Sequence, residues 1–217
     1  MFFGEMTMKK VLIAALLAGM SLSASAAQTI RFATEASYPP FELVDANNQI
    51  VGFDVDLANA LCKEIDATCT FTNQAFDSLI PGLKFRRFDA VMAGMDITPE
   101  REKQVLFTTP YYDNSALFVG QQGKYTSVDQ LKGKKVGVQA GSALLARLPE
   151  LKAMLEKTGG KLGPVVEYPS YPEAYADLAN KRLDYVINVV ISVNDLAKAK
   201  PKVFAKGLAV SGPGYMA

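Results

Sequence analysis

The sequence contains no histidine and no tryptophan, and it has only two cysteines among its 217 residues. Without histidine, the chain can form no Ser-His or Cys-His nucleophile pair and no zinc or facial-triad iron site that needs imidazole. No G-x-S-x-G, dinucleotide or phosphate-loop motif is present, and Gly133, Gly137 and Gly141 are expected in turns and helix ends. Asp54 and Asp56 are predicted to have a structural role at a helix N-terminal turn. We therefore expect no catalytic residue, no metal site and no cofactor.

An excess of charge of either sign is also lacking, because 23 Lys and Arg residues are balanced by 22 Asp and Glu residues. A formal net charge of +1 gives no electrostatic footprint for a polyanion, so nucleic acid is not an expected partner. Apolar residues make up 49% of the chain, which supports a packed core in one large domain or two small ones.

The sequence has no long hydrophobic run, and a short one lies near the N-terminus. Lys9 and Lys10 precede an apolar segment over residues 11–20, and small residues dominate residues 21–27. This is the arrangement of a secretory signal peptide, and the apolar segment is shorter than the roughly 20 residues that span a membrane. We predict that residues 1–26 are a cleaved signal peptide and that the mature protein is exported.

The two cysteines, Cys62 and Cys69, are separated by six residues. In an exported protein such a pair indicates a disulfide that closes a small loop, because the compartment is oxidising. Two buried free thiols are the alternative. A bridge across so short a loop is expected to be a local staple without a functional role.

Strand-like segments alternate with amphipathic ones after residue 28. The predicted strands cover residues 29–33, 68–72, 88–92, 115–119, 135–138, 165–168 and 184–187, and the predicted helices cover residues 53–65, 76–83, 142–157 and 171–180. This alternation predicts an α/β protein with parallel sheets, two lobes, and ligands bound at the carboxyl ends of strands.

Three stretches of the sequence, the first of them in two parts, carry a more specific signal. They are E-x-x-Y-P-P-F at 35–41 followed by G-F-D-V-D-L at 52–57, then F-D-S-L-I-P-G-L at 76–83, then G-M-D-I-T-P-E-R at 94–101. Together they closely resemble the periplasmic polar amino-acid binding proteins of ABC importers, and most of all the arginine-binding and lysine/arginine/ornithine-binding members. The resemblance runs from about residue 29 to about residue 188, and the spacing of the cysteines fits it.

The resemblance implies the two-lobed periplasmic-binding-protein fold of type II, the Venus flytrap, with the closing part of lobe 1 missing. The implied organisation is lobe 1 at 27–114, a hinge crossing at 115–119, lobe 2 at 120–207, and the start of a truncated return crossing at 208–217. It also implies a periplasmic protein that delivers a cationic L-amino acid, with arginine favoured, to the membrane permease of an ABC importer. We expect the protein to be a monomer.

The resemblance further assigns residues to the α-carboxylate and the α-ammonium group of a bound amino acid. Arg101 matches the family arginine that grips the carboxylate with its planar fork. Backbone N–H groups near Asp96, and at Ser142 and Ala143 where a helix begins, are implied to complete the cradle. The carbonyl of Gly94 and the side chain of Asp96 are implied to receive the ammonium.

Other residues match the subsite for a long cationic side chain. Tyr38 and Phe76 match the aromatic walls, which provide cation–π and apolar contacts. Glu35 is the implied counter-charge for the tip, and Gln139 is expected to line the same subsite from the second lobe. Taken without the motifs, the aromatic residues would be assigned to the core and Glu35 to a solvated loop.

One position departs from the family pattern. Family members carry an aspartate for the α-ammonium after the last strand of the second lobe, and the aligned residue here is Val189. A buried ammonium without a carboxylate is costly, so Asp96 or Asn188 is expected to take over this role.

Two alternatives to an amino-acid receptor stay open. One is an enzyme resembling the cyclohexadienyl dehydratases, with Glu35 or Asp96 as its acid–base group. The other is a truncated copy that binds no amino acid.

Overall fold

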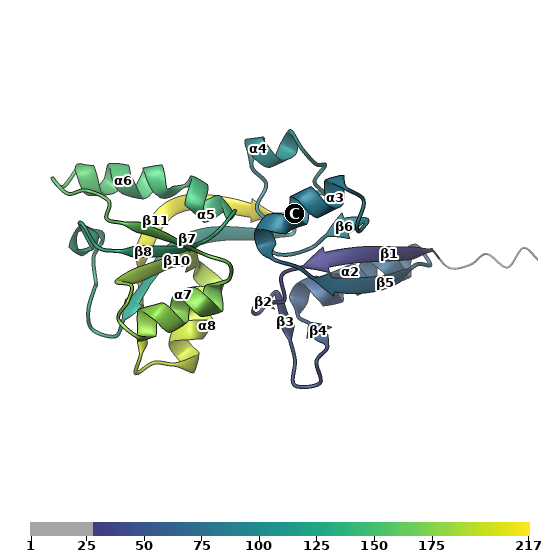
Figure 1. Cartoon of the computed structure of the whole chain (residues 1–217), viewed down its shortest axis with the longest axis horizontal. Helices are drawn as coiled ribbons and strands as arrows, with labels where there is room; N and C mark the ends of the chain where they lie inside the picture. Colours follow the sequence, from purple (N-terminus) through teal and green to yellow (C-terminus); the bar gives the residue numbers. More distant parts are fainter. Residues whose placement is uncertain (1–27) are drawn as a thin grey trace, which may run out of the picture.

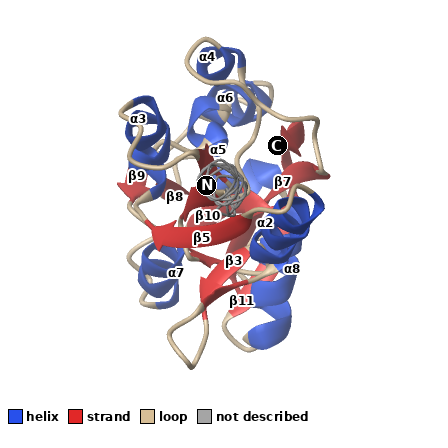
Figure 2. Ribbon diagram, turned by 90° about the vertical axis from the view of Figure 1, so that its right-hand side faces the viewer, coloured by secondary structure: helices blue, strands red, loops and turns tan. Residues whose placement is uncertain are grey.

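The computed structural model describes residues 28–217, without the side chains of residues 211–213, and the predicted signal peptide at 1–26 lies outside the described residues. Two lobes lie next to each other along the long axis of the molecule (Figure 1). The strands occupy the middle and the helices lie around them (Figure 2). Within the described residues, no helix combines the length and the apolar character that a membrane span requires.

The first lobe is built on a three-stranded parallel sheet in the order β5-β1-β6. Its strands are β1 (Thr29–Thr34), β5 (Thr68–Asn73) and β6 (Ala90–Val91), and its helices are α2 (Phe53–Glu64), η1 (Phe76–Ser78), α3 (Leu79–Lys84) and α4 (Pro99–Glu102). A disulfide joins Cys62 in α2 to Cys69 in β5, which confirms the predicted bridge. Phe32 and Ala33 point to opposite faces of β1, so a small apolar cluster forms on each face of this sheet.

A small antiparallel sheet in the first lobe was not predicted. It consists of β2 (Ser37–Tyr38), β3 (Glu42–Val44) and β4 (Ile50–Val51). Strands of two or three residues are too short to show an alternating pattern in the sequence. In this sheet Tyr38 pairs with Glu42, and the Asp54 N–H at the start of α2 donates to the Phe41 carbonyl at 2.9 Å. The hairpin is thereby attached to α2.

The second lobe holds a five-stranded mixed sheet in the order β11-β7-β10-β8-β9. Its strands are β7 (Tyr112–Gln121), β8 (Val136–Gln139), β9 (Val165–Tyr168), β10 (Tyr185–Val189) and β11 (Phe204–Met216), and its helices are η2 (Val128–Leu131), α5 (Ala143–Ala146), α6 (Leu148–Glu156), α7 (Tyr171–Ala179) and α8 (Val190–Ala199). Strands β8, β9 and β10 are parallel, whereas β7 is antiparallel to β10 and β11. The prediction of parallel sheets therefore holds for only part of this sheet.

Strands β7 and β11 extend from the second lobe to the first (Figure 1). They pair from Phe204 opposite Gln121 to Met216 opposite Tyr112, with register shifts between Lys206 and Ala209 and again before Pro213. At its end β11 reaches the 94–97 segment of the first lobe, where the Ile97 N–H donates to the Tyr215 carbonyl at 2.8 Å. The two lobes are thus linked by a pair of antiparallel strands.

Two predictions about local structure were wrong. The single helix expected over 142–157 is two helices, α5 and α6, because Pro149 lacks the N–H that an uninterrupted helix needs and instead lies in the first turn of α6. Gly137 lies inside β8, where a Cβ atom would come within 2.5 Å of the Leu183 side chain. Gly133 and Gly141 have positive φ angles, as turn glycines do.

Candidate ligand-binding site

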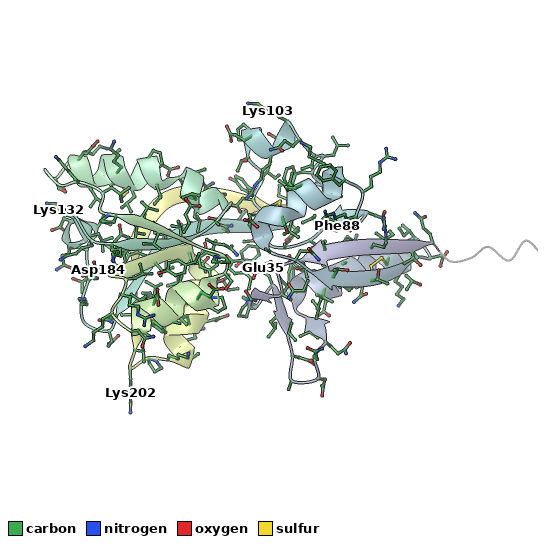
Figure 3. All side chains as sticks on the ribbon, viewed as in Figure 1. Glu35, Phe88, Lys103, Lys132, Asp184 and Lys202 are labelled. Atoms are coloured by element: carbon green, nitrogen blue, oxygen red, sulfur yellow. A yellow bond between two sulfur atoms is a disulfide. The ribbon has the colours of Figure 1, made fainter. Side chains whose placement is uncertain are left out.

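A cavity lies between the two lobes and is lined by residues of both. Its volume is about 30 Å³. The lining residues are Glu35, Tyr38, Phe76, Gly94, Asp96, Arg101, Asn114, Gln139, Ser142, Ala143, Leu144, Tyr171 and Val189. Every ligand-binding residue predicted from the sequence except Asn188 is in this set. Figure 3 shows Glu35 at the boundary between the lobes.

Arg101 lies in the short helix α4, and its guanidinium group spans the boundary between the lobes. The Thr98 hydroxyl caps this helix by accepting a hydrogen bond from the Arg101 N–H at 3.3 Å. Nη1 donates to the Asp96 carbonyl at 2.6 Å, and Nη2 donates to the Gly141 carbonyl of the second lobe at 2.9 Å. The Cζ atom lies 5.5 Å from the centre of the Phe76 ring. Burial lowers the pKa of Arg101, yet an arginine remains charged in proteins.

Asp96 provides a second charged group, which is only 5% exposed. Its Oδ1 accepts a hydrogen bond from Asn114 Nδ2 at 2.6 Å. Burial raises the pKa of Asp96, and the positive charges of Arg147 and Arg101 oppose that rise. Asn114 belongs to the site but was not predicted, because it lies in β7 one residue before the predicted strand at 115–119 and outside the motifs.

The aromatic wall of the cavity contains one more ring than the sequence predicted. Tyr38 stacks on Tyr171, with ring centres 5.5 Å apart and planes 24° apart. Tyr171 begins α7 and is only 3% exposed. Sequence reasoning treated Tyr171 as an ordinary helix residue, because no motif links the start of α7 to a residue in the other lobe.

Glu35 follows β1 and is 7% exposed, although it is a carboxylic acid. It accepts hydrogen bonds from the Ser37 hydroxyl and, at 3.4 Å, from Gln139 Nε2 of the second lobe. Burial raises the pKa of Glu35, and these two hydrogen bonds oppose that rise. Among the described residues, no Lys or Arg forms an ion pair with Glu35.

Ser142 and Ala143 lie at the start of α5, as predicted. The Ser142 hydroxyl caps the helix by accepting a hydrogen bond from the Leu145 N–H at 3.2 Å. Because α5 has only four residues, its N-terminus is part of one helical turn and not of the long helix that was predicted. The preceding Gly141 has φ of 69°, and a Cβ atom there would lie 3.1 Å from the Asp77 side chain of the first lobe. This glycine allows the lobes to approach each other closely.

Asn188, which was predicted to reach the α-ammonium, is not among the residues that line this cavity. Its Oδ1 accepts hydrogen bonds from the Tyr38 hydroxyl at 2.9 Å and the Val189 N–H at 2.7 Å, and its Nδ2 donates to the Tyr175 hydroxyl at 2.7 Å. It lines a separate, mainly apolar cavity of about 560 Å³ beside α7 and α8. Asn188 is therefore held away from the cavity between the lobes, and it fixes the hydroxyl of Tyr38.

The chain is similar to known proteins over nearly all its described length. Residues 30–159 match the family model described as bacterial extracellular solute-binding proteins, family 3. An Escherichia coli K12 protein provisionally named ABC transporter arginine-binding protein 2 is 68% identical over 96% of this chain and 82% of its own. ABC transporter arginine-binding protein 1 of the same organism is 49% identical, with the same coverage of each chain.

Solved structures agree with these relatives. A periplasmic binding protein of Salmonella typhimurium, whose structure is described in terms of high arginine specificity, superposes with a TM-score of 0.75 at 44% identity. The match covers 88% of this chain and 85% of that one. An ancestral arginine-binding protein bound to glutamine gives a TM-score of 0.75 at 34% identity, over 87% and 84% of the two chains. This protein has the type II periplasmic-binding-protein fold and belongs to the family 3 bacterial extracellular solute-binding proteins.

Proposed function

We propose that the protein binds L-arginine outside the cytoplasm and delivers it to the permease of an ABC importer. One observation carries the proposal: Arg101 and the buried acid Glu35, which has no cationic partner among the described residues, line the same cavity between two lobes. A zwitterion with a positively charged side chain supplies the opposite charge to each of them. The names of the relatives support the same ligand.

The backbone groups of the amino acid are bound by the first lobe and by the start of α5. The fork of Arg101 exchanges its contacts with the Asp96 and Gly141 carbonyls for the ligand carboxylate, which is the stronger, charge-assisted partner. The Ala143 N–H completes the carboxylate site, whereas the Ser142 N–H, also predicted for this role, donates to the Gln139 carbonyl at 3.2 Å in this structure. The Gly94 carbonyl and the Asp96 carboxylate accept hydrogen bonds from the α-ammonium.

The side chain of the ligand lies along the aromatic wall. Its guanidinium group stacks between aromatic faces, which Tyr38 and Phe76 provide, and its tip pairs with Glu35. Gln139, which already bonds Glu35, orients that carboxylate from the second lobe. A cation beside Glu35 also removes the cost of burying the carboxylate alone, so Glu35 favours arginine over a neutral amino acid.

Binding requires the lobes to open and close. The cavity of about 30 Å³ is far smaller than the roughly 300–1,000 Å³ of typical ligand pockets, so the lobes must separate to admit an amino acid. The connecting strands β7 and β11 are the segments that allow this hinge motion. Ligand contacts from both lobes then favour the closed state, which is the form that a permease can recognise.

An enzymatic role is not favoured. The named relatives are binding proteins. An enzyme would need an acid–base group in the cavity. The chain has no histidine, and Glu35 and Asp96 have roles in the proposed contacts to the amino acid. A copy that binds no amino acid is the negative outcome of the experiment below.

Thermal unfolding of the purified protein with millimolar amino acids tests the proposal. Arginine at one hundred times its dissociation constant should stabilise the protein by about 2.7 kcal/mol. Citrulline, which has nearly the same shape without the positive charge, and agmatine, which lacks the carboxylate, should shift the midpoint much less. A transition that no amino acid shifts would contradict the proposal, and equal shifts with citrulline would contradict the role of Glu35.

A further inference from the structure

Two carboxyl groups that make no proposed ligand contact lie buried together in the first lobe. Glu42 in β3 and Asp54 in the first turn of α2 are both fully buried. The Asp54 N–H donates to the carbonyl of Phe41, the residue before Glu42, at 2.9 Å, which brings the two residues together. In the part of the chain that the structure describes, no Lys or Arg forms an ion pair with either. The titratable groups that face the pair are Glu35, Tyr38 and Tyr111, and none of them is a cation.

The hydrogen bonds indicate which of the two carries a proton. Ionised carboxylates can only accept hydrogen bonds, so two of them in contact have nothing to share. Asp54 Oδ2 accepts from the Gly94 N–H at 2.8 Å and from the Tyr111 hydroxyl at 2.9 Å. Among the described residues, neither Asp54 Oδ1 nor either oxygen of Glu42 has a hydrogen-bond partner. A proton on Glu42, donated to the ionised Asp54, gives Asp54 Oδ1 the partner that it lacks and avoids a second buried negative charge. In agreement, burial and the charge of Asp54 both raise the pKa of Glu42 well above its usual value.

The pair is connected to the ligand cavity on two sides. Asp54 holds the N–H of Gly94, which has φ of 52° and lies so close to the Tyr38 ring that a Cβ atom would come within 3.1 Å of it. Glu42 is paired in the β2–β3 hairpin with Tyr38 itself. Gly94 and Tyr38 both line the cavity between the lobes. The pair therefore fixes two neighbouring parts of the cavity wall.

We propose that Glu42 and Asp54 share one proton and act as positioning residues for the amino-acid site. The protonated Glu42 carboxyl stabilises the Asp54 carboxylate, and Asp54 in turn orients Gly94. The proposal rests on the proposed function, in which the Gly94 carbonyl accepts a hydrogen bond from the α-ammonium. Neither carboxyl touches the ligand, so both act through the loop that does.

Three substitutions separate positioning from simple stability. Glu42→Gln keeps a neutral donor to Asp54 and should keep the arginine affinity of the wild type. Glu42→Met has a similar shape without the donor, and it should bind arginine about tenfold more weakly, because a buried acceptor then loses its partner. Glu64→Gln, at an exposed position near the end of α2, is the matched control and should change nothing. The measurement is the dissociation constant for arginine by calorimetry at pH 7.

The shared proton gives a second measurement that needs no ligand. Because the pKa of Glu42 is raised in the folded state, the stability that it contributes is present at acidic pH and is lost as the pH rises. Relative to Glu42→Gln, which cannot ionise, the folding equilibrium constant of the wild type should fall by up to about tenfold for each pH unit above pH 5. Chemical denaturation of both proteins between pH 5 and pH 9 measures this difference.

The outcomes are distinct. Parallel pH profiles for the wild type and Glu42→Gln would overturn the shared proton. Wild-type affinity in Glu42→Met would overturn the positioning role; if that variant does not fold, Tyr111→Phe, which removes another donor to Asp54, replaces it. If the wild type binds no arginine while the pH profiles diverge, the proposed function fails and the positioning role falls with it, but the proton assignment stands.

Discussion

Replacing Val189 with aspartate tests whether this chain lacks one ligand contact. Val189 is 3% exposed, lies at the end of β10 and lines the cavity between the lobes. The family resemblance places an aspartate for the α-ammonium at this position. Two side chains were predicted to take over the role of this aspartate, Asp96 and Asn188. Because Asn188 is hydrogen-bonded to two tyrosine hydroxyls, Asp96 is the remaining candidate. We therefore expect Val189→Asp to bind arginine more tightly than the wild type.

The size of the effect follows from the kind of contact that is added. A hydrogen bond to a charged group contributes about 1.5–3 kcal/mol, which corresponds to roughly 10- to 150-fold in the dissociation constant. The positions of Asp96 and Glu35 in the same cavity reduce the gain through repulsion between like charges. Without ligand, a buried carboxylate with no partner should lower the stability of the protein by about 1–3 kcal/mol. Tighter binding and a less stable ligand-free protein are thus expected together.

Calorimetric titration with arginine, and thermal unfolding without it, measure the two effects. Val189→Asn has the same shape without the charge and should show little of the gain. An arginine analogue without the α-amino group leaves the new carboxylate without a partner, so it should bind Val189→Asp no more tightly than it binds the wild type. Equal or weaker arginine binding by Val189→Asp would refute the reasoning, because it would mean that Asp96 already satisfies the ammonium.

Three further predictions concern the carboxylate grip, the disulfide and acid stability. Arg101→Lys should weaken arginine binding by about 100-fold or more, because a lysine cannot form the two-pronged contact, and calorimetry would detect it. Unchanged affinity would remove Arg101 from the carboxylate site. Replacing Cys62 and Cys69 by serine should lower the free energy of unfolding in urea by about 2–3 kcal/mol without changing arginine affinity. The Arg31 guanidinium holds the pKa of Asp89 at about 2, below its usual range. The stability from this pair should therefore be lost as the pH falls from about 4 toward 2, and Asp89→Asn should flatten this part of a melting profile at low salt.

The sequence predicted the parts of the fold that repeat a local pattern. The strand at 29–33 and the helix at 171–180 are present within one residue of the predicted bounds, because alternation and helical spacing extend over enough residues to be recognised. The hairpin at 37–51 was missed because its strands are too short. The break between α5 and α6 was missed because the helical pattern of apolar residues continues across Pro149.

The site was predicted where one motif holds several of its residues. Gly94, Asp96 and Arg101 come from a single segment, and the structure places all three on the cavity. Asn114 and Tyr171 could not be found in that way, because each reaches the cavity from a separate element that only the tertiary fold brings near. The direction of a side chain is equally hidden in the sequence: Asn188 and Val189 are neighbours on one strand and therefore face opposite sides of it.

The two strands that link the lobes differ in a way that bears on how long a ligand stays bound. Strand β7 is continuous, whereas its partner β11 has two register shifts in the stretch between Lys206 and Pro213. Strand pairs with register shifts separate more readily than regular ones. When the lobes move apart, we therefore expect β11 to bend more than β7. The residence time of the ligand would then depend on the β11 ladder as well as on the cavity. Substitutions that make the pairing of β11 with β7 regular should slow both the release and the uptake of the ligand, without changing the residues that contact it.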